Sequence, residues 1–144
     1  MRIVLQRVAH ASVRVGGAVV GKIGRGYVAL LGIGAEDDES MAFRMIEKIK
    51  KLRLFPDDDG KTNRSILDID GELLVVSQFT LYADCKKGNR PSFTAAAPPD
   101  RAEAIYDFFI DAAKPIFAKV AHGSFGTSMQ VELINDGPFT VILE

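Results

Sequence analysis

One short polar segment suits chemistry on a carbonyl group. Ser77, Gln78 and Thr80 place two hydroxyls and an amide directly after the apolar run Leu73–Val76. Hydrolysis of an ester needs hydrogen-bond donors aimed at the oxygen that becomes negative during the attack. The backbone N–H groups near Phe79 and Thr80 could supply such donors at the end of a strand. The alternative is an ordinary strand whose polar side chains bond to their neighbours.

A second segment, Asn135–Thr140, combines residues that fix an unusual backbone. We interpret it as a turn between two strands, with a simple tight hairpin as the alternative. Pro138 cannot donate a hydrogen bond to a neighbouring strand, and Gly137 lets the backbone approach a ligand closely. A Gly-Pro bond is also a candidate for the cis form, which places two neighbouring carbonyls on one side. Two fixed carbonyls could sort amino-acid ligands by their shape and their ammonium group.

Three other motif-like segments fail on their spacing. Residues 60–62 end like a phosphate-binding loop, but Phe55 stands where that motif needs its first glycine. Residues 24–29 match the glycine spacing of a dinucleotide-binding turn, but they open a strand-like run and not a helix. The aspartates 57–59 lack the spacing of an EF-hand loop, so we expect a solvated turn there. The sequence therefore predicts no metal and no cofactor.

Histidine and cysteine are scarce in this chain. His10, His122 and Cys85 are the only residues of these types, and their spacing does not fit a zinc site. A Ser-His-Asp triad would have to use one of the two histidines, and a structural or surface role is the expectation for both. Cys85 lies beside Lys86 and Lys87, but its surroundings in the sequence do not mark it as a nucleophile.

Bulk composition favours one globular domain covering residues 1–144, because the 144-residue chain is 47% apolar. No apolar run reaches the roughly 20 residues of a membrane-spanning helix. The N-terminus lacks the pattern of a signal peptide. Together with the single cysteine, these features predict a cytoplasmic protein without membrane contact. The net charge of −1 argues against binding DNA or long RNA, so an RNA partner should offer only one end.

Hydrophobic periodicity predicts an α/β fold, a compact single domain with a mixed or largely antiparallel sheet and two main helices. The first helix should bury one apolar face, made by Met41, Met45, Ile49 and Leu52. The second should begin at the prolines 98–99, and Pro115 should kink or end it. Short apolar or alternating runs predict strands at 1–7, 11–15, 27–33, 73–76, 129–134 and 139–143. Turns are expected at 16–17 and 24–26.

The two chemical segments resemble the signature motifs of the D-aminoacyl-tRNA deacylases. The matching residues are Ser77–Leu81 and Asn135–Thr140. The resemblance covers the whole chain and includes Gln6–Val8, Gly88–Phe93 and Gly123–Gly126. His122 stands where the family usually has threonine. Two specific motifs at the expected places in a chain of the expected length make a chance match improbable.

This resemblance implies a β/β/α fold and a homodimer with its pocket at the subunit interface. Gly137 and Pro138, as a cis pair, would enter the pocket of the other subunit and meet the amino group and α-carbon of the substrate. An L side chain would collide with this wall, whereas a D side chain would point outward. Glycine has no side chain to exclude, so glycyl-tRNA would also be cleaved. Arg7 would support the inserted motif across the interface.

The resemblance also assigns the remaining residues around the acceptor end of tRNA. Contacts to the terminal adenosine would come from Ser77, Gln78 and Phe79. The pocket would be shaped by Ala96, Phe125 and Met129. Apart from the resemblance, the positive charge of Lys86, Lys87 and Arg90 just after the first motif suits contacts to tRNA phosphates, with a solvated loop as the alternative.

Two mechanisms remain open for the ester hydrolysis. Thr80 could act as a nucleophile, but no partner base is evident in the sequence. Alternatively, the 2′-hydroxyl of the terminal ribose activates water while Phe79 and Thr80 supply oxyanion donors, which the scarcity of histidine favours. Two rival functions are a small-ester hydrolase that uses Thr80 or Cys85, and a non-enzymatic RNA-binding module. The lack of aromatic clusters and of basic excess argues against the second rival.

Overall fold

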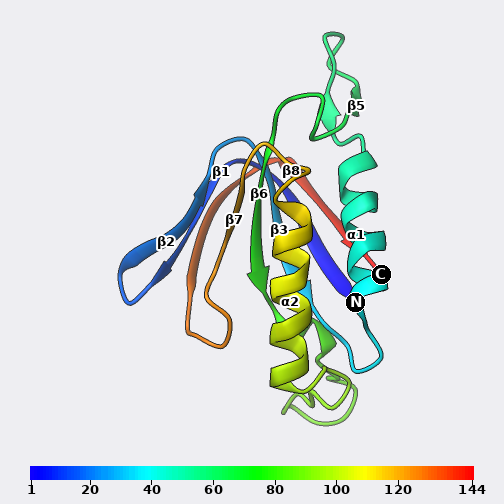
Figure 1. The fold of residues 1–144 in the computed structure, drawn as a ribbon, viewed down its shortest axis with the longest axis vertical. Helices are drawn as coiled ribbons and strands as arrows, with labels where there is room; N and C mark the ends of the chain where they lie inside the picture. The colour runs from blue at the N-terminus through cyan, green and yellow to red at the C-terminus, as the bar shows by residue number, and fades with distance from the viewer.

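The computed structural model describes residues 1–144, and its main sheet is built around one long strand. The first strands are β1 (Arg2–Val15), β2 (Ala18–Ile23) and β3 (Gly26–Gly32) (Figure 1). Residues 11–15 of β1 pair antiparallel with β2, with a register shift between Val13 and Arg14, and residues 2–8 pair antiparallel with β3. The register of residues 2–8 continues into residues 11–13. β2 and β3 therefore share one edge of β1. The chain passes from β2 to β3 through residues 24–25 without reversing its direction, so the turn predicted at 24–26 is wrong.

Two further strands extend the sheet and run parallel to β3. β6 (Glu72–Ser77) lies beside β3, and β7 (Val120–His122) lies beside β6. The run Leu73–Val76 is fully buried, as its apolar sequence predicts. β3 pairs antiparallel with β1 and parallel with β6, so the sheet is mixed. This confirms the expected α/β class.

The C-terminal strand β8 (Gln130–Leu143) pairs antiparallel with the other edge of β1. Gln6 faces Thr140 and Val8 faces Asn135, so the single residue Arg7 faces the four residues 136–139. Residues 136–139 are therefore looped out of one strand. The prediction of a turn between two separate strands is corrected on this point, because both flanks pair with β1 in the same direction.

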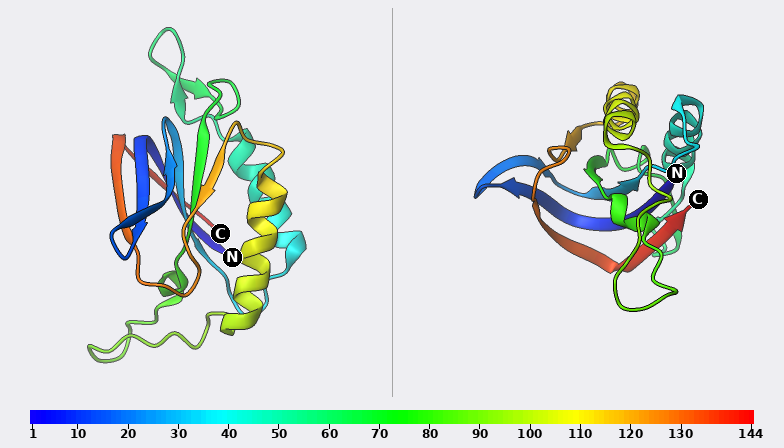
Figure 2. Two further views of the ribbon diagram at one scale, coloured as in Figure 1. Left: turned by 60° about the vertical axis from the view of Figure 1, so that its left-hand side comes forward. Right: turned by 90° about the horizontal axis from the view of Figure 1, so that it is seen from below.

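Both predicted helices are present, and they lie on the same side of the sheet (Figure 2). Their bounds are α1 (Glu39–Lys51) and α2 (Pro99–Ala113). Asp38 caps α1 by accepting the Met41 N–H at 3.0 Å, and α2 ends two residues before Pro115. Neither helix is long and apolar enough to cross a membrane.

The main core fills the space between the helices and the sheet. Ile46 and Ile49 of α1 and Phe109 of α2 are fully buried there. The Tyr106 hydroxyl of α2 donates to the Val75 carbonyl of β6 at 3.0 Å, and burial raises the pKa of Tyr106. This bond ties α2 to the strand that leads into the site.

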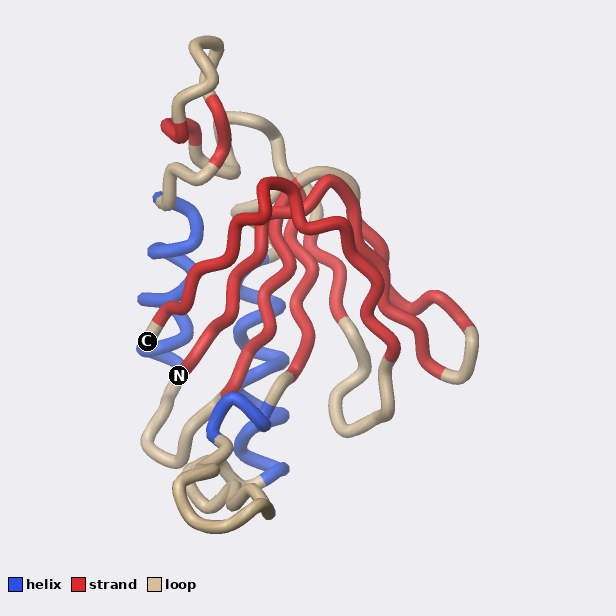
Figure 3. Tube along the Cα trace, turned by 180° about the vertical axis from the view of Figure 1, so that it is seen from behind, coloured by secondary structure: helices blue, strands red, loops and turns tan.

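Two short strands lie on either side of the turn expected at residues 57–59. β4 (Phe55–Pro56) and β5 (Thr62–Arg64) form a separate small sheet that projects beyond the main one (Figure 3). The aspartates between them form the expected turn, in which the Asp57 carboxylate accepts the N–H groups of Asp59 and Lys61 at 3.0 and 2.9 Å.

Candidate active site

The first motif lies where two parallel strands end together. Ser77 is the last residue of β6, and the Gln78 N–H donates to the Leu31 carbonyl of β3 at 2.8 Å. A short 3-10 helix, η1 (Phe79–Tyr82), follows at once. Carboxyl ends of adjacent parallel strands commonly border ligand sites because the chain diverges there.

Two adjoining hollows open at this edge, with volumes of about 490 and 290 Å³. They share four lining residues, Ser77, Gln78, Phe79 and Gly126. Ala96 and Phe125 line the larger hollow, and Met129 lines the smaller one. Six residues predicted for substrate contact therefore surround one continuous region, although they come from three separate parts of the chain.

The loop after β7 supplies one wall of this region. The Phe125 ring packs 5.6 Å from the Tyr106 ring, measured between centroids. The Ser124 N–H contacts the Met129 sulfur at 3.3 Å. A Cβ at Gly123 would lie 2.5 Å from that sulfur, so a side chain there would require the Met129 side chain to move. Phe125 and Met129 are thus held by local packing.

Phe79 and Thr80 have different surroundings within η1. Phe79 is 57% exposed and meets the edge of Phe93, with ring centroids 5.1 Å apart. Thr80 is exposed, lines neither hollow, and its hydroxyl accepts a hydrogen bond from the Gln78 amide. The N–H groups of Phe79 and Thr80 open η1, and neither donates among the backbone bonds outside helices and strands. These two N–H groups are therefore without a backbone acceptor.

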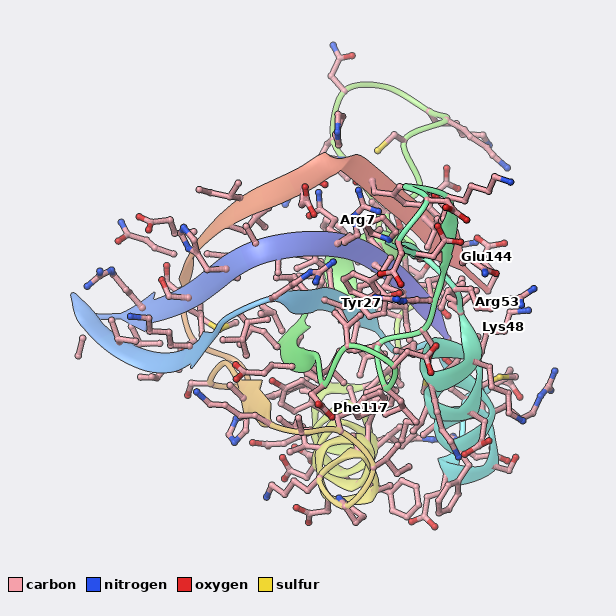
Figure 4. All side chains as sticks on the ribbon, turned by 90° about the horizontal axis from the view of Figure 1, so that it is seen from above. Arg7, Tyr27, Lys48, Arg53, Phe117 and Glu144 are labelled. Carbon is pink, nitrogen blue, oxygen red and sulfur yellow. The ribbon has the colours of Figure 1, made fainter.

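Arg7 organises the looped-out residues 136–139. Its Nε donates to the Asp136 carbonyl at 2.9 Å, and its Nη1 donates to the Leu54 carbonyl at 2.6 Å. The guanidinium also lies 4.9 Å from the Phe139 ring centroid. Figure 4 shows Arg7 between the ribbons of β1 and β8. Arg7 supports the bulge of its own chain, and its predicted role across a subunit interface stays a prediction.

Asn135 completes the support of this bulge. Its Oδ1 accepts the Phe139 N–H, and its Nδ2 donates to the Thr140 hydroxyl, both at 2.8 Å. The Gly137-Pro138 bond is cis, and both residues are exposed. Neither residue lines either of the two hollows of its own chain. Within one chain, the sequence-predicted site is thus divided into a pocket group and a bulge group.

The cationic candidates lie in the loop that follows η1. Lys86, Lys87 and Arg90 are exposed and form no ion pair. A bridge between Asp84 and Ser92 closes the base of this loop. None of the three cations lines a hollow, so they lie outside the pocket group.

The residues that sequence considerations set aside do not join the site. His122 Nδ1 contacts the Gly123 carbonyl at 2.8 Å, and His10 and Cys85 are exposed. No hydrogen bond links either histidine to Thr80. The structure contains no group of three or more His, Cys, Asp or Glu side chains placed to hold a metal ion.

Several pocket residues were missed by the sequence. Leu31 and Ile33 line the larger hollow from the end of β3, and further lining comes from Phe93, Pro98 and Ala102. The end of β3 had a usable signal, because parallel neighbours place their carboxyl ends at one edge. The other three come from the loop before α2 and from the start of α2. Their packing against the hollow produces no recognisable pattern in the local sequence.

Comparisons with known proteins agree with this geometry. A family model described as D-Tyr-tRNA(Tyr) deacylase matches residues 4–144. A D-aminoacyl-tRNA deacylase from Thermosipho africanus is 53% identical, covering 100% of this chain and 97% of that protein. One from Pseudomonas aeruginosa is 50% identical, covering 100% and 99% of the two chains.

Solved structures are similar over the same length. The structure of a c-Myc DNA Unwinding Element Binding Protein has a TM-score of 0.94 at 44% identity, covering 100% of this chain and 98% of that one. A probable eukaryotic D-amino acid tRNA deacylase has a TM-score of 0.87 at 16% identity, covering 99% and 97%, which shows the fold alone. The family model and these relatives place the chain in a class of hydrolases that act on the ester bond of aminoacyl-tRNA. The chain belongs to the D-aminoacyl-tRNA deacylase family within that class.

Proposed function

We propose that the two adjoining hollows bind the 3′ end of a tRNA that carries a D-amino acid or glycine. The single observation that carries this proposal is the gathering of Ser77, Gln78 and Phe79 on both hollows at the end of β6. Ser77 and Gln78 offer polar groups to the terminal adenosine, and the exposed Phe79 ring offers an apolar face. The apolar walls suit an amino-acid side chain.

Chiral selection then requires a wall from outside the chain. Gly137 and Pro138 are exposed on β8 and line neither of the two hollows of their own chain, whereas Arg7 and Asn135 hold the flanking residues Asp136 and Phe139. A rigid, exposed bulge suits insertion into the pocket of a second copy in a homodimer. There it rejects an L side chain by collision and accepts a D side chain or the hydrogen of glycine.

The proposed chemistry uses water activated by the 2′-hydroxyl of the substrate's terminal ribose. Thr80 has Gln78 as its hydroxyl partner and no base, which removes the usual means of activating a threonine. The N–H groups of Phe79 and Thr80 stabilise the oxyanion as the ester carbonyl is attacked. The hydroxyl of Thr80 is therefore dispensable in this mechanism.

Replacing Thr80 with valine tests the mechanism, because valine keeps the shape and the backbone N–H but lacks the hydroxyl. We expect kcat/KM for D-tyrosyl-tRNA to stay within about threefold of the parent, whereas loss of a nucleophile would cost about 10⁴-fold or more. Cys85→Ala is the parallel variant for the other candidate nucleophile. Loss of turnover in either folded variant would contradict the proposal.

The substrate proposal is tested by the products released by the purified protein. Free D-tyrosine should appear from D-tyrosyl-tRNA, and glycine from glycyl-tRNA, while L-tyrosyl-tRNA stays intact. Equal cleavage of the D and L substrates would remove the chiral proposal. An intact D substrate after prolonged incubation would overturn the proposed substrate.

The near-neutral charge fits a partner that is contacted at one end. The net charge is −1, and Lys86, Lys87 and Arg90 are free to meet phosphates of the acceptor strand. Extended DNA would need a larger cationic surface. A cytoplasmic location follows from this proposed tRNA substrate.

A further inference from the structure

Asp37 is the one buried carboxylate of the chain, with 7% of its surface exposed. It lies between β3 and α1, outside the residues that line the two hollows. Its Oδ2 accepts the Gly34 N–H at 2.6 Å and the Tyr82 hydroxyl at 3.3 Å. Its Oδ1 accepts from the amino group of Met1. Both oxygens therefore have donors, as a buried charge requires.

The Gly34 bond connects Asp37 to a wall of the larger hollow. Gly34 pairs with Ala96 in an isolated bridge, and the Ala97 N–H donates to the Ile33 carbonyl at 2.9 Å. Ile33, Ala96 and Ala97 all line that hollow. A carboxylate that fixes the Gly34 backbone thus also fixes the strand-like wall opposite it.

The Tyr82 bond connects Asp37 to η1. Tyr82 ends the 3-10 helix that Phe79 begins, and a Cβ at Gly34 would lie 2.7 Å from the Tyr82 hydroxyl oxygen. Burial, with the nearby Asp37 charge, raises the pKa of Tyr82 to about 12, so the phenol stays a donor. Arg2, the first residue of β1, also supports η1, because its side chain donates to the Leu81 carbonyl at 3.0 Å.

A third connection reaches α2. The Arg101 side chain donates to the Asp37 backbone carbonyl at 2.8 Å from the first turn of the helix. Pro98, Pro99 and Ala102 of the same segment line the larger hollow. Asp37 therefore contacts η1 and the start of α2 directly, and it connects to the wall formed by Ala96 and Ala97 through Gly34.

We propose that Asp37 is a positioning residue for the deacylation reaction, because it sets the distance between the oxyanion donors of η1 and the opposite wall of the pocket. This inference rests on the proposed function of the hollows. A carboxylate accepts hydrogen bonds with both of its oxygens. Asparagine has only one such oxygen and would point its NH₂ group at one of the donors. A shift of about 1 Å in such a wall is enough to slow a bound substrate's reaction.

The test compares Asp37→Asn with Asp38→Asn in steady-state hydrolysis of D-tyrosyl-tRNA, well below each variant's melting temperature. We expect Asp37→Asn to lower kcat by about tenfold or more while KM changes by less than about threefold. Asp38→Asn is the matched control, because asparagine also caps a helix and Asp38 touches no pocket wall. A purely structural role would lower the melting temperature and leave kcat per folded molecule unchanged.

Tyr82→Phe is the second variant, since it removes one hydroxyl from Asp37 and leaves the carboxylate in place. A smaller fall in kcat, with KM retained and the protein folded, supports the proposal. Parent-like kcat in folded Asp37→Asn overturns it, and if that variant does not fold, parent-like kcat in Tyr82→Phe does so. A parent protein inactive on D-tyrosyl-tRNA would overturn the proposed substrate instead, which separates the two failures.

Discussion

Gly137→Ala is expected to lower kcat/KM for D-tyrosyl-tRNA by about 100-fold. Gly137 has a φ of +138°, a region that L side chains rarely adopt. An added Cβ would lie 2.9 Å from the Phe139 nitrogen and 3.2 Å from the Arg7 Nη2. The methyl group therefore displaces the bulge from the support of Arg7, and in the proposed dimer the partner's pocket then loses its wall. Single-turnover release of D-tyrosine measures the effect.

Gly16→Ala provides the matched control for this substitution. Gly16 also has a positive φ, of +55°, but a Cβ there would meet nothing within 4 Å. We expect a modest loss of stability and parent-like turnover, because the β1–β2 hairpin is far from either motif in the chain. Parent-like turnover of folded Gly137→Ala would show that the bulge has no part in catalysis.

The largest expected effect on stability comes from Gly26→Ala. A Cβ at Gly26 would lie 1.8 Å from the Glu72 carbonyl oxygen and 2.6 Å from the Glu72 nitrogen. Because both atoms belong to the backbone of the paired strand, β3 and β6 cannot keep their register. We expect the free energy of unfolding to fall by about 4 kcal/mol or more, measured by urea denaturation.

Gly24→Ala is the control, two residues earlier in the same segment. Its Cβ would lie 3.9 Å from the Glu72 side chain, which is an ordinary contact. Its effect on the free energy of unfolding should stay within about 0.5 kcal/mol. Similar unfolding midpoints for Gly24→Ala and Gly26→Ala would contradict the close approach of β3 and β6.

The two helices and the end of β6 could be predicted because their signals are local. Asp38 and the lysines near the end of α1 mark its two termini, and Pro99 opens α2. The buried run Leu73–Val76 places Ser77 at a strand end without any long-range information. The motif match then supplied chemistry that spacing alone left open.

Pairing partners could not be predicted in this way. Glycine, proline and aspartate report local backbone preferences: glycine marks the break at 24–25, and all three residue types occur in the bulge at 136–139. Whether the chain reverses there depends on the strand that its flanks join. For the bulge, that strand carries Arg7, which is 129 residues from Asp136. Only the strand register of the folded chain shows that both flanks of the bulge pair with β1.

The pocket walls were also beyond local prediction. Leu31, Phe93 and Ala102 meet because β3, the loop and α2 pack together, and none carries a chemical signature. Asp37 resembles the other acidic residues at the start of α1 in sequence. Its burial and its bonds to Gly34 and Tyr82 distinguish it only in the fold.

The central proposal is that a pocket from one subunit and a bulge from another form one active site. Mixing two inactive variants tests it: Ala96→Phe fills the larger hollow, and Gly137→Ala displaces the bulge. After subunit exchange, confirmed by mass, each mixed dimer would hold one intact pocket facing one intact bulge. The D-tyrosyl-tRNA deacylase activity of an equal mixture should then rise to about a quarter of the parent's. No gain of activity in the presence of mixed dimers would contradict the shared site.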